Sequence, residues 1–284
     1  MNLNDMRTRM GVISENHWKD VKEACRGKTV VLVEGEDDKQ VLEALFALRR
    51  SRWEVGVAIV AAGNRHEVLK RLAEPTTFRH TLGFIDRDVW TDEEVARTRA
   101  RFPDRLFVTA GWCLESHYLN GSQSALLPAD VWAQLQDERE AWIRAGALYW
   151  TLQRRFDACA KLRDIVGWDY GKPHPDLDPA DEVNLAAQLQ RKLSEREPHW
   201  EAQVDFTSAS LAAACAERYQ TVAAWSTERQ WLQGLHGKYF FEGQVGPALE
   251  RHHHRQGNWR VELVKEWQRP YPEPFDEFLA VLFP

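Results

Sequence analysis

The first 126 residues alternate short runs of aliphatic residues with stretches whose apolar positions recur every three or four residues. The run TVVLVEG at Thr29–Gly35 is apolar over consecutive positions, as in a strand buried on both faces. The stretch 37–50 that follows has the apolar spacing of one helix face. Because this alternation repeats, it predicts a mainly parallel sheet wound with helices. Further strands are expected at 55–63, 81–88 and 105–111, further helices at 64–74 and 91–102, and a preceding amphipathic helix at 14–26.

From about Pro128 the apolar pattern is helical only. The Pro/Gly/Asp-rich stretch 167–182 predicts a loop, and Pro270, Pro272 and Pro274 precede a short final helix. We therefore expect an α/β domain at 1–127 and an all-helical domain at 128–284, in which the many tryptophans serve core and helix packing. The helices of the second domain are expected at 129–145, 148–165, 180–193, 208–220 and 226–235.

Composition narrows the class of protein. The chain has 284 residues, 44% of them hydrophobic, which suffices for one large core or two modest ones. No apolar run approaches the ~18 residues of a membrane span, and the N-terminus lacks the apolar stretch of a secretory signal. The four cysteines form no CxxC pair, which argues against a zinc knuckle or a disulfide framework. A reducing cytoplasm is the expected location, with no membrane partner.

The net charge of −6 is unevenly distributed. Before Leu127 the chain has 19 basic and 19 acidic residues, whereas 18 basic and 24 acidic residues follow. A general nucleic-acid coat would be basic throughout, so nucleic acid is expected to meet only local patches, such as Arg49, Arg50 and Arg52 or the stretch 251–255. Three adjacent histidines, His252–His254, point in different directions on a helix. They predict a polar or RNA-facing surface rather than a metal site.

Carboxylates follow several of the predicted strands. Glu34 ends the first strand, Asp86 and Asp88 end the third, and Glu115 follows the fourth within a few residues. In an open parallel sheet, ligands bind outside the carboxyl ends of the strands, at the point where the strand order reverses. Clustered carboxylates raise one another's pKa and destabilise the fold unless a cation neutralises them. For an all-oxygen cluster, that cation is Mg²⁺ or Mn²⁺.

Some of these acids have a simpler explanation. Glu36 and Asp37 begin a predicted helix, where acids interact favourably with the helix dipole. Asp38 can play the same part or can turn back to the edge that carries Glu34. Asp88 can equally be a turn residue after a strand.

Three strings in this region resemble a known family. VVLVEGEDDKQVLEAL resembles the first motif of Toprim domains, and LGFIDRD resembles their D-x-D motif. FVTAGWCLESHYLNG is similar to the Toprim nucleases related to the overcoming-lysogenization-defect (OLD) family, and most to the stand-alone AriB-type effectors of PARIS anti-phage defence. The resemblance covers Thr29–Gly121, and it implies a Rossmann-like Toprim domain. The segment LHGKYFFE resembles a Gly-Lys element found late in such proteins.

The resemblance also implies a chemistry. It suggests an endonuclease that uses Mg²⁺ or Mn²⁺ to hydrolyse the phosphodiesters of RNA, such as tRNA, or of DNA. It further implies an ABC-type ATPase as a partner chain that controls an anti-phage effector, and self-association into a homodimer. The catalytic residues would be Glu34, Asp86, Asp88 and Lys238, and the metal ligands Glu34, Asp38, Asp86, Asp88 and Glu115.

Two other functions stay open. A phosphoryl-transfer domain would use Asp37 or Asp38, Asp86, Thr109 and Lys238, but it leaves Asp88 without a role. A non-catalytic docking subunit of an ATPase complex would use the Trp-rich, acidic second half as its contact surface. Lys238 itself can be a surface lysine after a glycine turn. The chain has no GxGxxG after its first strand and no GxxxxGK[ST], so neither a Rossmann dehydrogenase nor an ATPase is expected.

Overall fold

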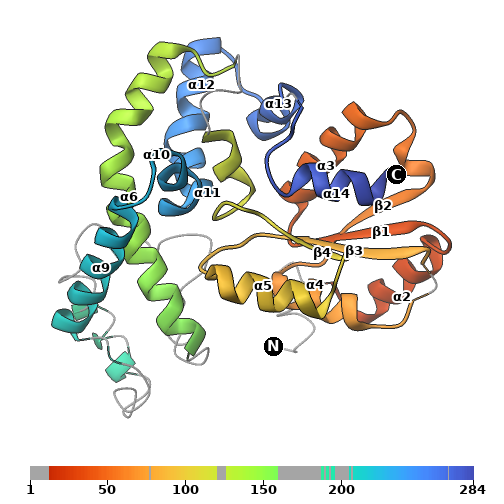
Figure 1. Ribbon diagram of the computed structural model, residues 1–284, viewed down its shortest axis with the longest axis horizontal. Helices are drawn as coiled ribbons and strands as arrows, with labels where there is room; N and C mark the ends of the chain where they lie inside the picture. The colour runs from red at the N-terminus through yellow and green to blue at the C-terminus, as the bar shows by residue number, and fades with distance from the viewer. Residues whose placement is uncertain are drawn as a thin grey trace. The chain divides into compact units, whose positions relative to one another are not determined.

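The computed structural model describes residues 13–76, 78–119, 126–158, 187–188, 190–191, 193–195, 205, 207–267 and 269–284 (Figure 1). These residues form two compact units. The first comprises the described residues of Met1–Leu114 and Gln256–Pro284, with Leu126. The second comprises those of Glu115–Gly121 and Leu127–Arg255.

A four-stranded parallel sheet forms the centre of the first unit. Its strands lie in the order β2-β1-β3-β4, and every neighbouring pair is parallel. The chain passes from β1 outward to β2 and then crosses to the other side of β1, so the strand order reverses between β1 and β3. This confirms the expected α/β class and the parallel sheet. The strands are β1 (Thr29–Val33), β2 (Val57–Ala61), β3 (His80–Ile85) and β4 (Leu106–Val108).

The helices expected between the strands are present. The helix expected at 91–102 begins with a capped first turn, in which Thr91 is the N-cap residue. Thr91 N donates to Glu94 Oε2 at 2.9 Å, and Glu94 N donates to Thr91 Oγ1 at 3.3 Å, so both hydrogen bonds of a capping box form. The elements are α2 (Glu15–Ala24), α3 (Glu36–Arg49), a short 3₁₀ helix η1 (Trp53–Val55), α4 (Arg65–Ala73) and α5 (Asp92–Arg101).

Helices cover both faces of the sheet, with α2, α4 and α5 on one side and α3 and α14 (Phe275–Leu282) on the other (Figure 1). On the α4 face, Val30, Leu32 and Ile85 share one core with residues of α4. A Cβ placed on Gly83 of β3 would lie 2.6 Å from Leu72 Cδ1. A larger residue at this position would displace the Leu72 side chain, so glycine favours the close packing of α4 on the sheet.

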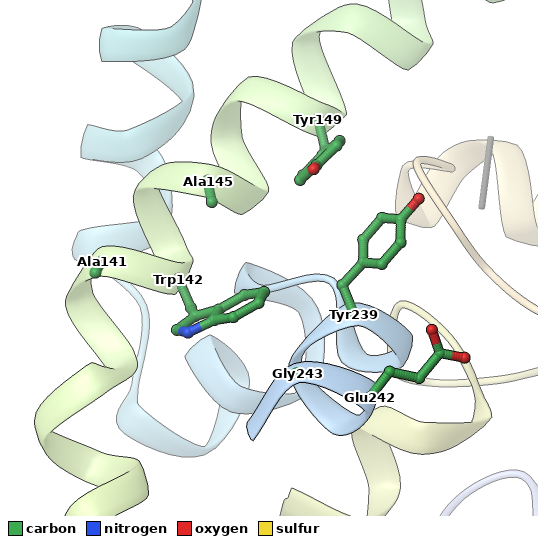
Figure 2. Close-up of a pocket in the computed structure, with 7 residues that line it drawn as sticks. All are labelled: Ala141, Trp142, Ala145, Tyr149, Tyr239, Glu242 and Gly243. Carbon is green, nitrogen blue, oxygen red and sulfur yellow. The ribbon is translucent and has the colours of Figure 1, made fainter. Parts of the chain in front are cut away.

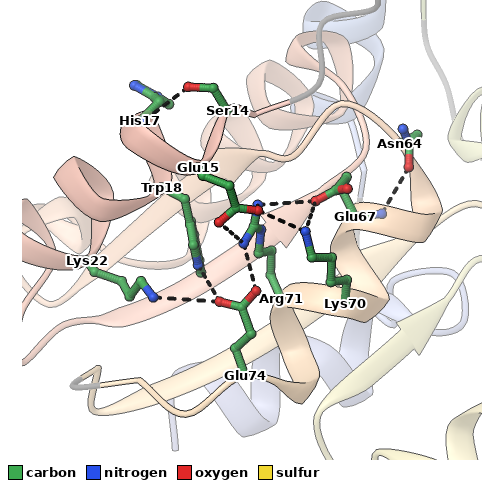
Figure 3. A network of polar contacts seen from close by, with 10 residues as sticks. All are labelled: Ser14, Glu15, His17, Trp18, Lys22, Asn64, Glu67, Lys70, Arg71 and Glu74. Carbon is green, nitrogen blue, oxygen red and sulfur yellow. Dashed lines mark hydrogen bonds and ion pairs between the residues drawn. The ribbon is translucent and has the colours of Figure 1, made fainter. Parts of the chain in front are cut away.

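A polar network around Arg71 attaches α2 to α4 (Figure 3). The Arg71 guanidinium is 1% exposed and pairs with Glu15, Glu67 and Glu74 at 2.8, 3.3 and 2.7 Å. Trp18 Nε1 donates to Glu74 Oε2 at 2.8 Å. Hydrogen bonds from Arg71 and then Lys70 lower the pKa of Glu15 to about 2. The predicted N-terminal helix is thus part of the first unit through one buried cation shared by three carboxylates.

The chain returns to the first unit after residue 255, a return that the sequence division at 127/128 did not include. Helix α13 (Trp259–Lys265) contacts α3, and α14 packs through Phe278. The Phe278 ring lies 5.7 Å from that of Phe46, 5.2 Å from Phe84 and 5.0 Å from Phe107. The short final helix was expected from its pattern; the aromatic contacts explain why it belongs with the sheet.

The described residues of the second unit are helical. The helices expected at 129–145 and 148–165 are one continuous helix as far as residue 158, so the expected break between them is wrong. Gly146 does not end the helix: a Cβ there would lie 2.6 Å from Gly234 O, so glycine allows a close backbone contact. The expected loop at 167–182 and nearly all of the helix at 180–193 lie outside the described residues. The elements are η2 (Leu114–Leu119), α6 (Ala129–Ala158), α9 (Ser208–Ala223), α10 (Thr227–Arg229), η4 (Gln230–Gly234), α11 (Gly237–Phe240), η5 (Phe241–Val245) and α12 (Gly246–His253).

Tryptophans in the second unit pack against other rings, as expected. Trp231 is buried, with its ring 5.1 Å from that of Trp132 and 5.4 Å from that of Phe240. Within the described ranges of the chain, no helix is both apolar enough and long enough to cross a membrane.

Candidate active site at the carboxyl edge of the sheet

Glu34 and Asp86 meet where the strand order reverses. Glu34 directly follows β1 and Asp86 directly follows β3, which pairs with β1. The Asp86 backbone N–H donates to Glu34 Oε1 at 3.0 Å, and Asp86 Oδ1 accepts from Leu114 N at 2.9 Å. Both acids are half-buried. The structure therefore brings these two predicted site residues together at the carboxyl edge of the sheet, the edge at which α/β folds bind ligands.

The D-x-D loop that begins at Asp86 is held through its backbone. Arg87 N donates to the buried Thr109 Oγ1 at 2.9 Å, and Asp88 N donates to Trp112 O at 2.6 Å. Three consecutive amides of this loop are thus bound, one to Glu34 and two to the segment that follows β4. These backbone hydrogen bonds hold the loop in addition to the bonds that the two carboxylates accept themselves.

Asp88 has a cationic partner that the sequence did not reveal. Arg65, the first residue of α4, pairs with Asp88 Oδ2 at 3.1 Å, and its guanidinium lies 4.2 Å from the centre of the Trp90 ring. Asp88 has a φ of 50°, a conformation that aspartate adopts more readily than most residues. Arg65 lies at the start of α4, just beyond the loop that follows β2, so its place after a strand was the one available signal.

Asp38 turns back toward the start of its own helix. Its Oδ2 accepts from Gly35 N at 2.9 Å, which caps the first turn of α3. Asp38 is also close enough to Glu34 to raise the pKa of that carboxyl. Both roles considered from the sequence are therefore compatible with its position. Glu36 is exposed and pairs with Lys39 at 3.3 Å, and Asp37 is exposed as well.

Electrostatics single out Glu34. Burial of the carboxyl is the largest cause that raises its pKa to about 8, and the Asp88 carboxylate is the second. Arg65 and the Asp86 amide act in the opposite direction, and they do not cancel the increase. This edge thus holds more acid than its own cations neutralise, a state that cation binding relieves.

The donor set suits a hard divalent cation, because carboxylate oxygens are the ligands that Mg²⁺ and Mn²⁺ prefer. In the part of the chain that the structure describes, however, no three His, Cys, Asp or Glu side chains lie close enough together to hold an ion as they stand. One oxygen each of Glu34, Asp38, Asp86 and Asp88 is bound to a protein donor. The chemistry and charge of the cluster fit the metal, and binding would require these side chains to turn.

The other two predicted site residues lie in the second unit. Glu115 is buried in η2, and Lys238 is half-buried in α11. Their part in the site stays a prediction. Burial also lowers the pKa of two histidines of this unit, His117 and His236, to about 3 each, so both are neutral core residues at pH 7.

The histidine run His252–His254 ends α12. His252 and His254 are exposed and His253 is half-buried, as expected for a polar surface.

A cavity of about 480 Å³ lies within the second unit (Figure 2). Trp142 and Tyr149 of α6 and Tyr239 of α11 surround it, and Glu242 is its one acidic residue. The Tyr149 and Tyr239 ring centres are 5.2 Å apart. This largely aromatic cavity contains none of the predicted site residues.

No family model matches the chain, and neither a curated protein nor a solved structure matches it. Its function has to be inferred from its own residues, and the acidic edge between β1 and β3 is the feature with the clearest chemistry.

Proposed function

We propose that the protein is a Toprim-type nuclease that uses Mg²⁺ or Mn²⁺ to hydrolyse the phosphodiester bonds of RNA, such as tRNA, or of DNA. One observation carries the proposal: Glu34 after β1 and the Asp86/Asp88 pair after β3 lie where the strand order reverses, and the Asp86 amide is bonded to the Glu34 carboxylate. The resemblance of the surrounding strings to Toprim motifs supports it.

Four carboxylates of the first unit are assigned to the cation: Glu34, Asp38, Asp86 and Asp88. For Glu115, which belongs to the second unit, the role of a ligand rests on the resemblance alone. A bound divalent ion would polarise the phosphate and lower the pKa of a water molecule. The backbone amides that hold the D-x-D loop orient Asp86 and Asp88 in advance, which reduces the reorganisation that catalysis requires.

One cationic residue of the first unit belongs to the proposed site. Arg65 limits the repulsion between Asp88 and Glu34, a role that a bound cation would take over. For Lys238, of the second unit, the resemblance implies a role in offsetting the negative charge that develops on the phosphate.

The proposal also covers the cellular role of the protein, its partner and its oligomeric state. We propose that the chain is a cytoplasmic anti-phage effector controlled by an ABC-type ATPase partner, and that it forms a homodimer. The sequence support for this setting is the likeness to stand-alone effectors of that kind.

A cleavage assay tests the activity. The purified chain is incubated with tRNA, total RNA and plasmid DNA, each with Mg²⁺, Mn²⁺ or EDTA. We expect fragments or nicks with metal and none with EDTA. Asp86→Asn should abolish cleavage while it keeps the oxygen that accepts from Leu114 N. The matched control is Glu36→Gln, an exposed acid close to the site, which should cleave as the unmodified chain does. Full activity of Asp86→Asn would contradict the assignment.

The same assay with a co-expressed ATPase separates the nuclease from the docking subunit. Cleavage that appears when the ATPase releases the chain would support the controlled nuclease. Silence on every substrate, with and without the ATPase, combined with tight binding to it, would favour a non-catalytic subunit.

A further inference from the structure

The opposite edge of the same sheet, where the strands begin, contains a groove of about 820 Å³. Thr29, Val57 and His80, the first residues of β1, β2 and β3, line its floor. The groove is therefore separated from the acidic edge by the length of the strands. None of the residues assigned to cleavage lines it.

Most of the charged residues that line this groove are arginines. Arg50, Arg52 and Arg79 line it and are exposed. Their guanidinium groups form no ion pair or hydrogen bond with the described residues. The Arg50 guanidinium has one cation–π contact, with its Cζ 6.0 Å from the centre of the Phe283 ring. Three such groups around one concave surface favour an anionic ligand, because the guanidinium fork matches phosphate oxygens.

A fourth arginine is fixed in place. Arg105 Nε donates to Thr81 O at 3.1 Å, and its Nη2 donates to Leu72 O at 2.7 Å, so the side chain keeps one orientation in the groove. Two acids line the groove as well. Glu74 is already paired with Arg71, and Asp104 is exposed. The balance of charge in the groove is therefore positive.

Apolar side chains, some of them aromatic, line the groove as well. Trp53, Phe78 and Phe283 do so together with aliphatic residues. Phe78 and Phe283 are buried, whereas the side chain of Trp53 is half-buried, and its ring lies 5.3 Å from that of Phe46. A base has a flat apolar face that can pack on such a ring, and nucleotide bases gain about 1–3 kcal/mol each from aromatic stacking in known single-strand sites.

We propose that this arginine groove (Arg50, Arg52, Arg79 and Arg105, with the half-buried Trp53) binds a nucleotide: phosphate oxygens on the guanidinium groups and a base on the Trp53 ring. The ligand is a free nucleotide or one nucleotide of a single strand, since the two share this chemistry. The volume lies in the range of about 300–1,000 Å³ that small-ligand sites occupy. The site is distinct from the acidic edge.

Equilibrium binding in EDTA tests the groove without any cleavage. The probes are ATP and a fluorescent single-stranded oligouridylate of about 12 nucleotides, a length within reach of known single-strand sites. The variant is Arg52→Glu/Arg79→Glu, in which both residues are exposed and the fold is expected to stay intact. The matched control is Arg97→Glu/Arg101→Glu, which changes the net charge equally on exposed positions of α5 outside the groove.

Loss of two phosphate contacts should weaken oligouridylate binding about 25-fold at about 0.1 M salt and reduce the salt slope by about 1.4, because each contact to a single strand contributes about 0.7. If a free nucleotide is the ligand, ATP should bind with the same dependence on Arg52 and Arg79 and displace the oligonucleotide. If a strand is the ligand, ATP should compete only weakly.

Two results would overturn the proposal. One is that the Arg52/Arg79 variant binds both probes as tightly as the unmodified chain. The other is that the α5 control weakens binding equally, which would indicate charge alone. Since no metal is present in this assay, a chain that never cleaves can still bind here, and an active nuclease can still fail to bind.

Discussion

The two edges of one sheet differ in charge and in how firmly that charge is held. At the carboxyl edge, acids follow the strands, and backbone hydrogen bonds hold the loop that carries Asp86 and Asp88. At the amino edge, Arg50, Arg52 and Arg79 line a groove, and their guanidinium groups form no ion pair or hydrogen bond with the described residues. Fixed, partly buried acids, among them Glu34 with its raised pKa, suit chemistry, whereas exposed arginines with free donors suit binding.

The largest effect should come from testing both edges in one cleavage assay. Asp86→Asn removes a charged ligand, so we expect kcat to fall roughly a thousandfold, with oligonucleotide binding little changed. This fall corresponds to an increase of about 4 kcal/mol in the activation free energy. If a substrate strand occupies the arginine groove, Arg52→Glu/Arg79→Glu should instead raise KM and leave kcat unchanged. If each variant altered both constants alike, the two edges would not have separate tasks.

The protonation of Glu34 offers the next largest effect. Its pKa rises from 4.5 to about 8 on folding, so between these values the folded chain binds more protons than the unfolded one. The free energy of unfolding should therefore fall as pH rises through this window. Glu34→Gln cannot lose a proton, and its amide oxygen can still accept from Asp86 N. It should be more stable than the unmodified chain by on the order of 2 kcal/mol near pH 9, and by much less near pH 5.

Urea unfolding curves at both pH values measure this difference in metal-free buffer. A Glu34→Gln variant that is less stable than the unmodified chain near pH 9 would show that the Glu34 carboxylate is not under electrostatic strain.

A smaller effect is expected at Thr109, which holds the D-x-D loop from behind. Its buried Oγ1 accepts from Arg87 N and donates to Gly111 O at 3.0 Å. Thr109→Val has nearly the same shape but leaves the Arg87 amide without its partner, which should cost about 1–3 kcal/mol of stability. Cleavage should fall too, since one of the three amide hydrogen bonds that position the D-x-D loop would be lost.

The conservative variant Thr109→Ser keeps the hydroxyl and should restore cleavage at saturating substrate. If Thr109→Val and Thr109→Ser lost activity equally, packing rather than the hydrogen bond would position the loop.

The smallest expected effect is the change in stability on replacing Arg52 at the amino edge of the sheet. Arg52 has a φ of 59°, which is strained for any residue with a Cβ. Arg52→Gly should relieve this strain and raise stability by about 0.5 kcal/mol, after the larger entropy of glycine in the unfolded chain is subtracted. It should also weaken nucleotide binding. Arg50→Gly, at a φ of −152°, should weaken binding without any gain in stability, as thermal unfolding would show.

Much of the first unit could be predicted from the sequence, because its strands are continuous apolar runs between helical patterns. TVVLVEG produced β1 within two residues, and Thr91 with Glu94 marked the start of α5. The continuity of α6 through Gly146 was missed because glycine often interrupts a helix. Here the glycine instead leaves room for the backbone of Gly234, which packs against α6. The pattern of α14 indicates an apolar face but does not reveal which surface that face covers.

For the candidate site, local sequence indicated Glu34, Asp86 and Asp88, since each follows an apolar run. Arg65 was missed because a charged residue that begins a helix looks like solvated surface, and only the tertiary fold brings it to Asp88. The arginine groove was indicated only in part: Arg50 and Arg52 are neighbours in the chain, whereas Arg79 and Arg105 come from other loops.

The packing of α14 on Phe46, Phe84 and Phe107 has a consequence for biosynthesis. All four strands of the sheet leave the ribosome long before residues 275–282 do. The face of the sheet that α14 covers therefore stays exposed to solvent while the second unit is translated. Completion of the first unit is therefore delayed until the second has been synthesised. A chaperone that shields aromatic surface would have its opportunity in that interval.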